Sequence, residues 1–168
     1  MTMPRKQSFR SLLQHIRILL LDVDGVMTDG GIYYSNSGDE LKKFNAQDGY
    51  GITKLQKAGI KVGIITGRLS TIVKRRAKEL GIEEVYQNFE NKMDAYESIK
   101  KKLNIIDANI AYIGDDEFDL AVLKCAGFSA APADAVPVVK KHVRYICSRG
   151  GGNGAVREVI DLILKNQR

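Results

Sequence analysis

The sequence predicts an α/β fold in which helices cover both faces of a parallel sheet, as in Rossmann-like proteins. Runs of apolar and β-branched residues alternate with segments of helical period, and several of those segments end at a glycine. Such alternation is typical of parallel sheets, because a helix carries the chain back before the next strand pairs. With 168 residues, 44% of them hydrophobic and 27% charged, the chain is expected to form one domain over residues 1–168.

Five apolar runs are expected to form the strands of this sheet. They span residues 16–23, 61–66, 109–115, 127–132 and 143–147. Helical periodicity predicts helices at residues 48–59, 69–81, 92–104, 117–127 and 135–142. The basic stretch 1–15 is expected to form an arm or short helix, and residues 148–168 a Gly-rich tail followed by a helix.

Residues 30–45 interrupt the alternation and are expected to form a β-hairpin. The segment contains the sequence IYYS, a turn at residues 36–39 and the sequence ELKKF. Because it directly follows the first strand, the hairpin is expected to leave the sheet as a flap at the edge where that strand ends.

Polar residues follow three of the expected strands. They are Asp22 and Asp24 after the first, Thr66, Gly67 and Arg68 after the second, and Asp115, Asp116 and Asp119 after the third. In a parallel sheet the carboxyl ends of the strands meet at one edge, which is where open α/β sheets bind ligands. The sequence therefore predicts that these side chains form one site.

Three carboxylates at one edge repel one another and raise each other's pKa values unless a cation compensates them. The three are Asp22, Asp24 and Asp115. Carboxylate and carbonyl oxygens are the ligands that Mg²⁺ prefers, and the ion keeps water or substrate oxygens in its coordination shell. The sequence therefore predicts a magnesium site with room for a phosphate ester.

The spacing of Asp22 and Asp24 suits phosphoryl transfer, because side chains two residues apart on an extended segment point the same way. One carboxylate can attack phosphorus and form an aspartyl-phosphate, while the other protonates the leaving alcohol and later accepts a proton from water. Thr66 and Lys92, the latter where a loop meets a helix, are expected to bind the phosphoryl group. These residues predict a phosphate-ester hydrolase.

In chain order, the sequences DVDGV and ITGR, a lysine before a helix, and the sequence GDDEFD resemble the four motifs of the haloacid dehalogenase (HAD) superfamily. The resemblance implies a capless HAD-type fold with Asp22 as the nucleophile and Asp24 as the acid/base. It also implies that the Asp22 side chain, the Asp24 carbonyl and Asp115 bind the metal. Asp116 or Asp119 is expected to support the metal site without binding the ion directly.

Other stretches, TDGGIYY, KKFNAQDGYGI and RGGGNGAVREVIDLIL, are similar to the 3-deoxy-D-manno-octulosonate 8-phosphate (KDO 8-phosphate) phosphatases. The similarity implies hydrolysis of a small anionic sugar phosphate by a homotetramer in which hairpins pair and the Gly-rich tail reaches a neighbouring site. It further implies substrate contacts from Asn45, Asp48, Gly67, Arg68 and Arg76. The alternatives are a nonulosonate 9-phosphate phosphatase and a non-catalytic oligomerisation or regulatory protein on the same scaffold.

The net charge of +6 fits an anionic substrate better than nucleic acid, because the basic residues are spread over several expected helices without interleaved aromatic residues. No apolar run approaches the ~18–20 residues of a membrane span. Cys125 and Cys147 form no CxxC pair, so free thiols and a cytoplasmic location are expected. The GGGNGA pattern at residues 150–155 lacks the βαβ unit of a dinucleotide site.

Overall fold

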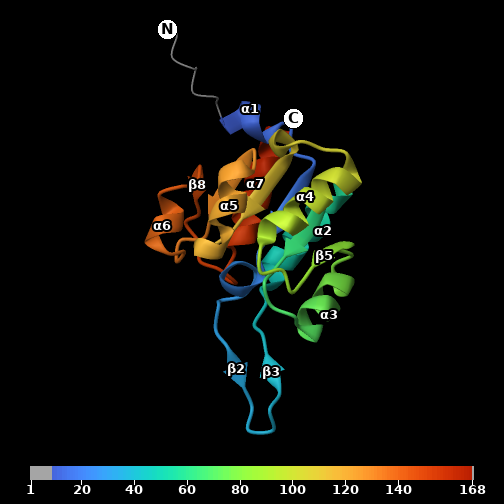
Figure 1. Cartoon of the computed structure of the whole chain (residues 1–168). Helices are drawn as coiled ribbons and strands as arrows, with labels where there is room; N and C mark the ends of the chain where they lie inside the picture. Colours follow the sequence, from blue (N-terminus) through green and yellow to red (C-terminus); the bar gives the residue numbers. More distant parts are fainter. Residues whose placement is uncertain (1–8, 168) are drawn as a thin grey trace.

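The computed structural model describes residues 9–167, in which six strands pair in parallel as one sheet (Figure 1). In chain order the strands are β1 (Ile18–Leu21), β4 (Lys61–Ile65), β5 (Glu84–Tyr86), β6 (Ile110–Ile113), β7 (Phe128–Ala131) and β8 (Tyr145–Ile146). Across the sheet their order is β5-β4-β1-β6-β7-β8, so β1 is an interior strand paired with β4 and β6. The α/β fold predicted from the sequence is confirmed.

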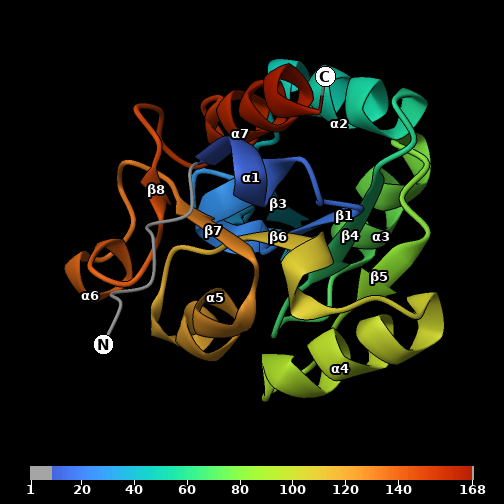
Figure 2. The same ribbon diagram turned by 90° about the horizontal axis from the view of Figure 1, so that it is seen from above.

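Helices cover both faces of the sheet (Figure 2). They are α1 (Phe9–Leu13), α2 (Ala46–Lys57), α3 (Thr71–Glu79), α4 (Lys92–Leu103), α5 (Leu120–Cys125), α6 (Pro137–Lys140) and α7 (Ala155–Asn166). One apolar core contains residues of α2, α3 and α7, and the other contains residues of α4, α5 and α6. Successive residues of β1 contribute to opposite cores, which explains why its sequence is apolar throughout rather than alternating.

The structure differs from the sequence-based expectation in the number of strands. The three-residue strand β5 was not predicted, because its segment is too short and too polar to show a strand pattern. Of the expected N-terminal arm, residues 1–8 lie outside the described residues, and the rest includes α1. Both cysteines are free thiols. Within residues 9–167, no helix combines the length and the apolar character needed to cross a bilayer.

The hairpin expected at residues 30–45 projects from the carboxyl edge of the sheet, away from the helical layers (Figure 1). Its strands β2 (Tyr33–Tyr34) and β3 (Glu40–Leu41) are antiparallel, with Tyr33 opposite Leu41. A backbone bridge between Thr28 and Phe44 closes its base. Several large apolar side chains of the hairpin are exposed: Ile32, Tyr33, Tyr34 and Leu41.

The Gly-rich segment 150–154 packs against the turn that follows β1 in the same chain. The Gly152 N–H donates to the Val26 carbonyl at 3.0 Å, and the Gly151 N–H donates to Asp134 Oδ1 at 2.9 Å. A Cβ atom on Gly151 would overlap the Gly25 carbonyl, so the close approach requires glycine. These glycines therefore have a role within their own chain, which the expectation of a tail reaching a neighbouring site did not include.

We expect the substitution Gly151→Ala to lower the free energy of unfolding by about 1–3 kcal/mol, because the added methyl group overpacks the contact with Gly25. Urea denaturation measures the effect. Gly67→Ala is the matched control, since the nearest atom to its added Cβ is the Phe89 carbonyl oxygen at 3.6 Å, an ordinary contact. Equal stability of the two variants would contradict the packing described here.

Candidate active site

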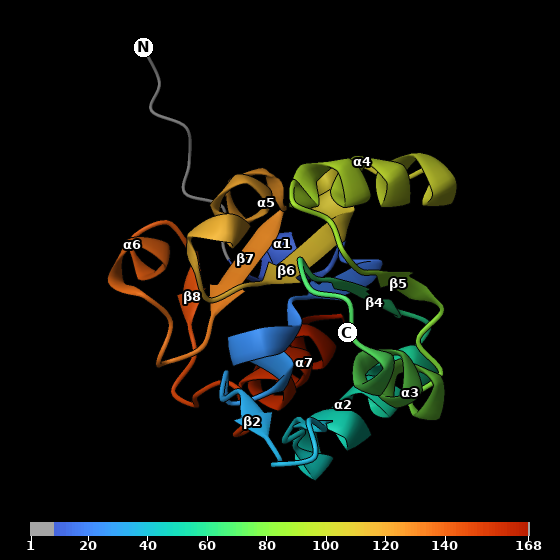
Figure 3. The same cartoon turned by 60° about the horizontal axis from the view of Figure 1, so that its bottom comes forward.

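A cavity of about 630 Å³ lies at the carboxyl edge of the sheet. Figure 3 brings this end of the molecule forward and shows the turn that follows β1, in blue, close to α7. The expected site residues that line the cavity are Asp22, Asp24, Thr66, Gly67, Arg68, Lys92, Asp115, Asp116 and Asp119. Four segments that are far apart in the sequence thus meet at one place, as the parallel arrangement requires.

The register between β1 and β6 brings two of the strand ends together. Leu21 lies opposite Ile113, and the Asp22 N–H donates to the Ile113 carbonyl at 3.0 Å. Asp22 and Asp115 therefore leave the sheet at the same level. Gly25, with a φ of +90°, turns the chain here, and a Cβ atom at this position would overlap the Asp115 carboxylate.

Lys92 is the cation that joins two of the carboxylates. Its Nζ lies 2.7 Å from Asp22 Oδ1 and 2.7 Å from Asp119 Oδ1, and its side chain is 6% exposed. It is the first residue of α4, a helix capped by the Asn91 side chain. Burial lowers the pKa of the Lys92 ammonium, but the charges of the two aspartates outweigh this effect and the net shift is upward. Lys92 therefore remains charged in the site.

Asp119 fixes the loop that carries Asp115. Its Oδ1 accepts from Lys92 and, at 2.5 Å, from the Tyr112 hydroxyl. Its Oδ2 accepts the N–H of Asp115 at 2.9 Å and that of Asp116 at 3.3 Å. The side chain of Asp116 is exposed and caps the following turn, so Asp119 is the residue that supports the cluster. The sequence analysis did not predict this contact of Tyr112, because a tyrosine inside an apolar strand is typical of a hydrophobic core.

The carboxylates of Asp22 and Asp115 are suited to hold a divalent cation. Carboxylate oxygens of Asp22, Asp115 and Asp119 lie within 4.8 Å of one another, and Asp115 Oδ1 is buried without a hydrogen-bond partner. Burial and the neighbouring aspartates raise the pKa of Asp115 to about 8, and burial raises the pKa of Asp22 to about 6 despite Lys92. Since the oxygens of Asp119 accept protein hydrogen bonds, Asp22 and Asp115 supply the available ligand atoms, which fit Mg²⁺.

The side chain of Asp24 belongs to a second charge cluster, formed with the hairpin. Lys42 Nζ donates to Asp24 Oδ1, and Arg68 Nη1 lies 4.0 Å from Asp24 Oδ2. Glu40 Oε1 accepts from Arg68 at 2.9 Å and lies 3.5 Å from Lys42 Nζ. The sequence analysis missed Glu40 and Lys42. The available signal was their spacing, since residues two apart in a strand share one face.

The remaining wall of the cavity combines a hydroxyl group with apolar side chains. Thr66 is buried at the end of β4, and its N–H donates to the Tyr86 carbonyl at 2.9 Å. Its Oγ1 accepts the Arg68 N–H at 3.4 Å, which leaves the hydroxyl hydrogen available to a ligand. The apolar lining comes from Ile32, Phe89 and Phe118.

Three of the expected substrate-binding residues do not line this cavity, and their local partners explain why. Asn45 caps α2 through its side-chain oxygen. Asp48 is 3% exposed, and its Oδ1 accepts the Arg157 N–H at 2.8 Å in the first turn of α7. The Arg76 guanidinium lies over the Phe44 ring, 5.7 Å from its centre. In this chain all three are engaged in local contacts, and their part in substrate binding stays a prediction.

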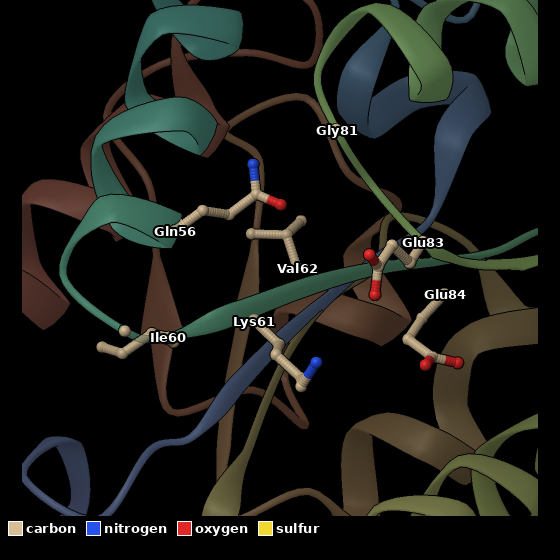
Figure 4. Close-up of a pocket in the computed structure, with 8 residues that line it drawn as sticks. Gln56, Ile60, Lys61, Val62, Gly81, Glu83 and Glu84 are labelled. Atoms are coloured by element: carbon tan, nitrogen blue, oxygen red, sulfur yellow. The ribbon is translucent and has the colours of Figure 1, made fainter.

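A second cavity, of about 310 Å³, lies at the amino end of β4 (Figure 4). Its lining includes the neutral Gln56 and the charged residues Lys61, Glu83 and Glu84, so charges of both signs are present. The one group of three potential metal ligands found among residues 9–167 lies in the first cavity. We therefore assign the candidate active site to the carboxyl edge of the sheet.

Comparisons with known proteins show what this chain resembles. Residues 51–127 match the family model of haloacid dehalogenase-like hydrolases. The chain is 47% identical, over 92% of its length, to the 3-deoxy-D-manno-octulosonate 8-phosphate phosphatase KdsC of Escherichia coli strain K12, of which it covers 82%. The resemblance inferred from the sequence motifs is confirmed.

Solved structures show the same similarity. The crystal structure of 3-deoxy-D-manno-octulosonate 8-phosphate phosphatase from Yersinia pestis matches with a TM-score of 0.93 and 46% identity, covering 95% of this chain and 86% of that one. The phosphatase of the same description from Moraxella catarrhalis, solved with a magnesium ion, a phosphate ion and KDO, matches with a TM-score of 0.92 and 44% identity. That match covers 95% of this chain and 91% of the other.

In the metal-free protein we expect the free energy of unfolding to fall as the pH rises from about 4 to about 8. Asp22 and Asp115 have pKa values raised above 3.8 in the folded state, so folding favours their protonated forms. Below pH 3.8 both groups are protonated in the folded and the unfolded state, so they do not change the free energy of unfolding. Above pH 3.8 that free energy falls until both groups have ionised in the folded state, near pH 8. Urea denaturation in the presence of a chelator, at several pH values, measures it.

Added Mg²⁺ should stabilise the protein, and the increase should grow with pH, because the ion binds the deprotonated carboxylates. The variant Asp115→Asn should show a weaker pH dependence and a smaller effect of Mg²⁺. A stability that responds to neither pH nor Mg²⁺ would show that these carboxylates do not form a cation site.

Proposed function

This chain belongs to the haloacid dehalogenase-like hydrolase family, and from that premise we propose that it is a Mg²⁺-dependent phosphatase that hydrolyses KDO 8-phosphate to KDO and phosphate. The observation that carries the proposal is the buried cluster in which Lys92 joins Asp22 and Asp119 beside the unpartnered oxygen of Asp115. The similarity to the Moraxella catarrhalis enzyme, which was solved with magnesium, phosphate and KDO, supports both the metal and the substrate.

In the first step, an Asp22 carboxylate oxygen attacks phosphorus and the bond from phosphorus to the sugar oxygen breaks. The electron pair of that bond goes to the sugar oxygen, which takes a proton from the Asp24 carboxyl group. The Lys92 ammonium, 2.7 Å from Asp22 Oδ1, and the Thr66 hydroxyl are placed to stabilise the phosphoryl oxygens. The products of this step are the free sugar acid and a phosphorylated Asp22.

In the second step, water attacks the phosphorus of phosphorylated Asp22 and gives a proton to the Asp24 carboxylate, which releases phosphate and restores both aspartates. The side chains of Asp22 and Asp115 and the carbonyl of Asp24 would hold Mg²⁺. When bound, the ion neutralises charge on the transferring phosphoryl group. Asp119 keeps Lys92 and the Asp115 loop in place through the contacts described above.

The acidic sugar would be recognised at the mouth of the cavity. Gly67 and Arg68 line it, and the Arg68 side chain is 41% exposed, so its guanidinium can reach a ligand carboxylate. Ile32 and Phe118, which are also exposed, offer apolar surface to the carbon chain of the sugar. The excess of basic residues over the whole chain favours the approach of an anionic substrate.

We expect Asp22→Asn to lower the rate of phosphate release from KDO 8-phosphate by about 10⁴-fold or more, because the amide is a poor nucleophile. Steady-state phosphate release measures the rate, and circular dichroism checks the fold. Asp161→Asn is the matched control, since Asp161 lies on α7 and pairs with Arg157 at 2.8 Å, away from the cavity. Removal of Mg²⁺ by a chelator should stop the reaction, and added Mg²⁺ should restore it.

The same assay with a nonulosonate 9-phosphate separates the two substrate hypotheses. A larger kcat/KM for the nine-carbon ester would contradict the proposed substrate while keeping the reaction. No phosphate release from either ester would favour the non-catalytic alternative. A full rate for Asp22→Asn would exclude the covalent mechanism.

We also propose a cytoplasmic homotetramer whose sites are completed by a neighbouring subunit. The hairpin supports an assembly, because its side chains Ile32, Tyr34 and Leu41 are more than half exposed. The hairpin itself projects beyond the helical layers (Figure 1). The two free thiols are compatible with a reducing compartment.

The double substitution Tyr34→Ser and Leu41→Ser should shift the assembly toward monomers, because it removes apolar area from the hairpin. Mass photometry measures the shift. Ile106→Ser, which changes an equally exposed apolar residue just before β6, is the control and should leave the mass unchanged. A monomeric wild-type protein would remove the proposal of shared sites.

A further inference from the structure

We infer that Lys42 is a positioning residue for Asp24, because the structure places its buried ammonium on one oxygen of that carboxylate. The inference rests on the proposed function, in which Asp24 exchanges a proton with the leaving oxygen. It adds a residue that the motifs do not contain. It also gives the hairpin a part in catalysis.

The burial of the Lys42 side chain is unusual for a lysine in an exposed hairpin. Its side chain is 1% exposed, whereas the side chain of the next residue, Lys43, is 53% exposed. A buried ammonium must be paired, because an unpaired charge in the interior is strongly unfavourable. The partners of Lys42 are Asp24 Oδ1 and, at 3.5 Å, Glu40 Oε1. The Lys42 ammonium is therefore bound to the carboxylate of Asp24, the proposed acid/base.

The neighbouring charges restrict the orientation of the Asp24 carboxylate further. Arg68 Nη1 lies 4.0 Å from Asp24 Oδ2, and Arg68 Nη2 is held by Glu40 Oε1 at 2.9 Å. Asp24 thus has one oxygen bound to Lys42 and the other next to Arg68, at the wall of the cavity. Rotation of the carboxylate would break the contact with Lys42, so its orientation is fixed before a substrate binds.

The attachment of the hairpin to the rest of the chain does not by itself explain the buried contact of Lys42 with Asp24. The base of the hairpin is closed by the backbone bridge between Thr28 and Phe44. Lys43 provides a further tie, through Asp29 at 3.7 Å and Asn153 at 3.1 Å. These contacts do not involve Lys42. Loss of the Lys42 ammonium should therefore release the Asp24 carboxylate while the hairpin remains attached.

The choice of leaving group distinguishes a positioning role from a structural one. A sugar alkoxide is a poor leaving group and needs a proton as the bond to phosphorus breaks, whereas p-nitrophenolate leaves without one. The value of kcat/KM reports on the steps up to this first bond cleavage. A misplaced Asp24 should therefore lower kcat/KM for the sugar ester and spare p-nitrophenyl phosphate.

The test compares kcat/KM and kcat of the full-length protein with Mg²⁺ for KDO 8-phosphate and p-nitrophenyl phosphate. We expect Lys42→Met to lower kcat/KM for the sugar ester by about 10- to 100-fold, mainly through kcat, and for the aryl ester by less than about 3-fold. Lys43→Met is the matched control and should change neither. Lys42→Arg retains a cation beside Asp24 and should recover most of the loss.

The double variant Lys42→Met with Asp24→Asn shows whether Lys42 acts through Asp24. If it does, Lys42→Met should have no further effect on the sugar ester once Asp24 is replaced. If Lys42→Met does not fold, Lys42→Gln replaces it, because the amide retains a donor of similar reach without the charge. Thermal melting of each variant identifies a loss of folded protein.

Equal loss with both esters would show a structural role and overturn the inference. A loss that persists in the Asp24→Asn background, or that appears only in KM, would show that Lys42 contacts the substrate instead. Failure of the proposed substrate is recognised separately, since the wild-type protein would then not hydrolyse KDO 8-phosphate. In that case phenyl phosphate, whose leaving group is more basic than p-nitrophenolate, replaces the sugar ester in the same comparison.

Discussion

Electrostatic compensation at one edge of the sheet is the constraint on which this structure depends. Asp22, Asp24, Asp115 and Asp119 converge there, and two buried lysines divide these carboxylates into two clusters. Lys92 joins Asp22 to Asp119, and Lys42 holds Asp24. The separation gives the two neighbouring aspartates of the first motif different surroundings. Asp22 faces the metal cluster and Asp24 faces the hairpin, which fits their different proposed roles as nucleophile and acid/base.

The position of the catalytic side chains depends on parts of the chain that contain no catalytic residue. The turn after β1 is held by the Gly-rich segment, where Gly152 donates to Val26 and Gly151 leaves no space for a side chain. Asp48, inside α2, caps the first turn of α7, which follows that segment. The C-terminal part of the chain therefore supports the loop that begins with Asp22, although more than a hundred residues separate them in the sequence.

The hairpin combines two properties that are usually found on different elements. Glu40 of β3 and Lys42, which directly follows β3, belong to the charge cluster around Asp24. The opposite side and β2 expose apolar residues, among them Tyr34 and Leu41. Contacts made by the apolar side chains in an assembly would therefore act on the same hairpin that contains Lys42. The hairpin thus links the exposed apolar surface directly to Asp24.

The sequence by itself determined the α/β fold, the hairpin and the convergence of Asp22, Thr66, Lys92 and Asp115, because hydrophobic periodicity and the parallel direction of strands are local or topological properties. Tertiary structure alone decided which other polar residues contact those of the site. Asp48 was expected near the substrate, and its carboxylate accepts a backbone N–H from the first turn of α7. Lys42 was not singled out, and its side chain is buried against Asp24. Both outcomes depend on which distant atoms come within hydrogen-bond reach once the elements pack, and residue type and spacing do not specify this.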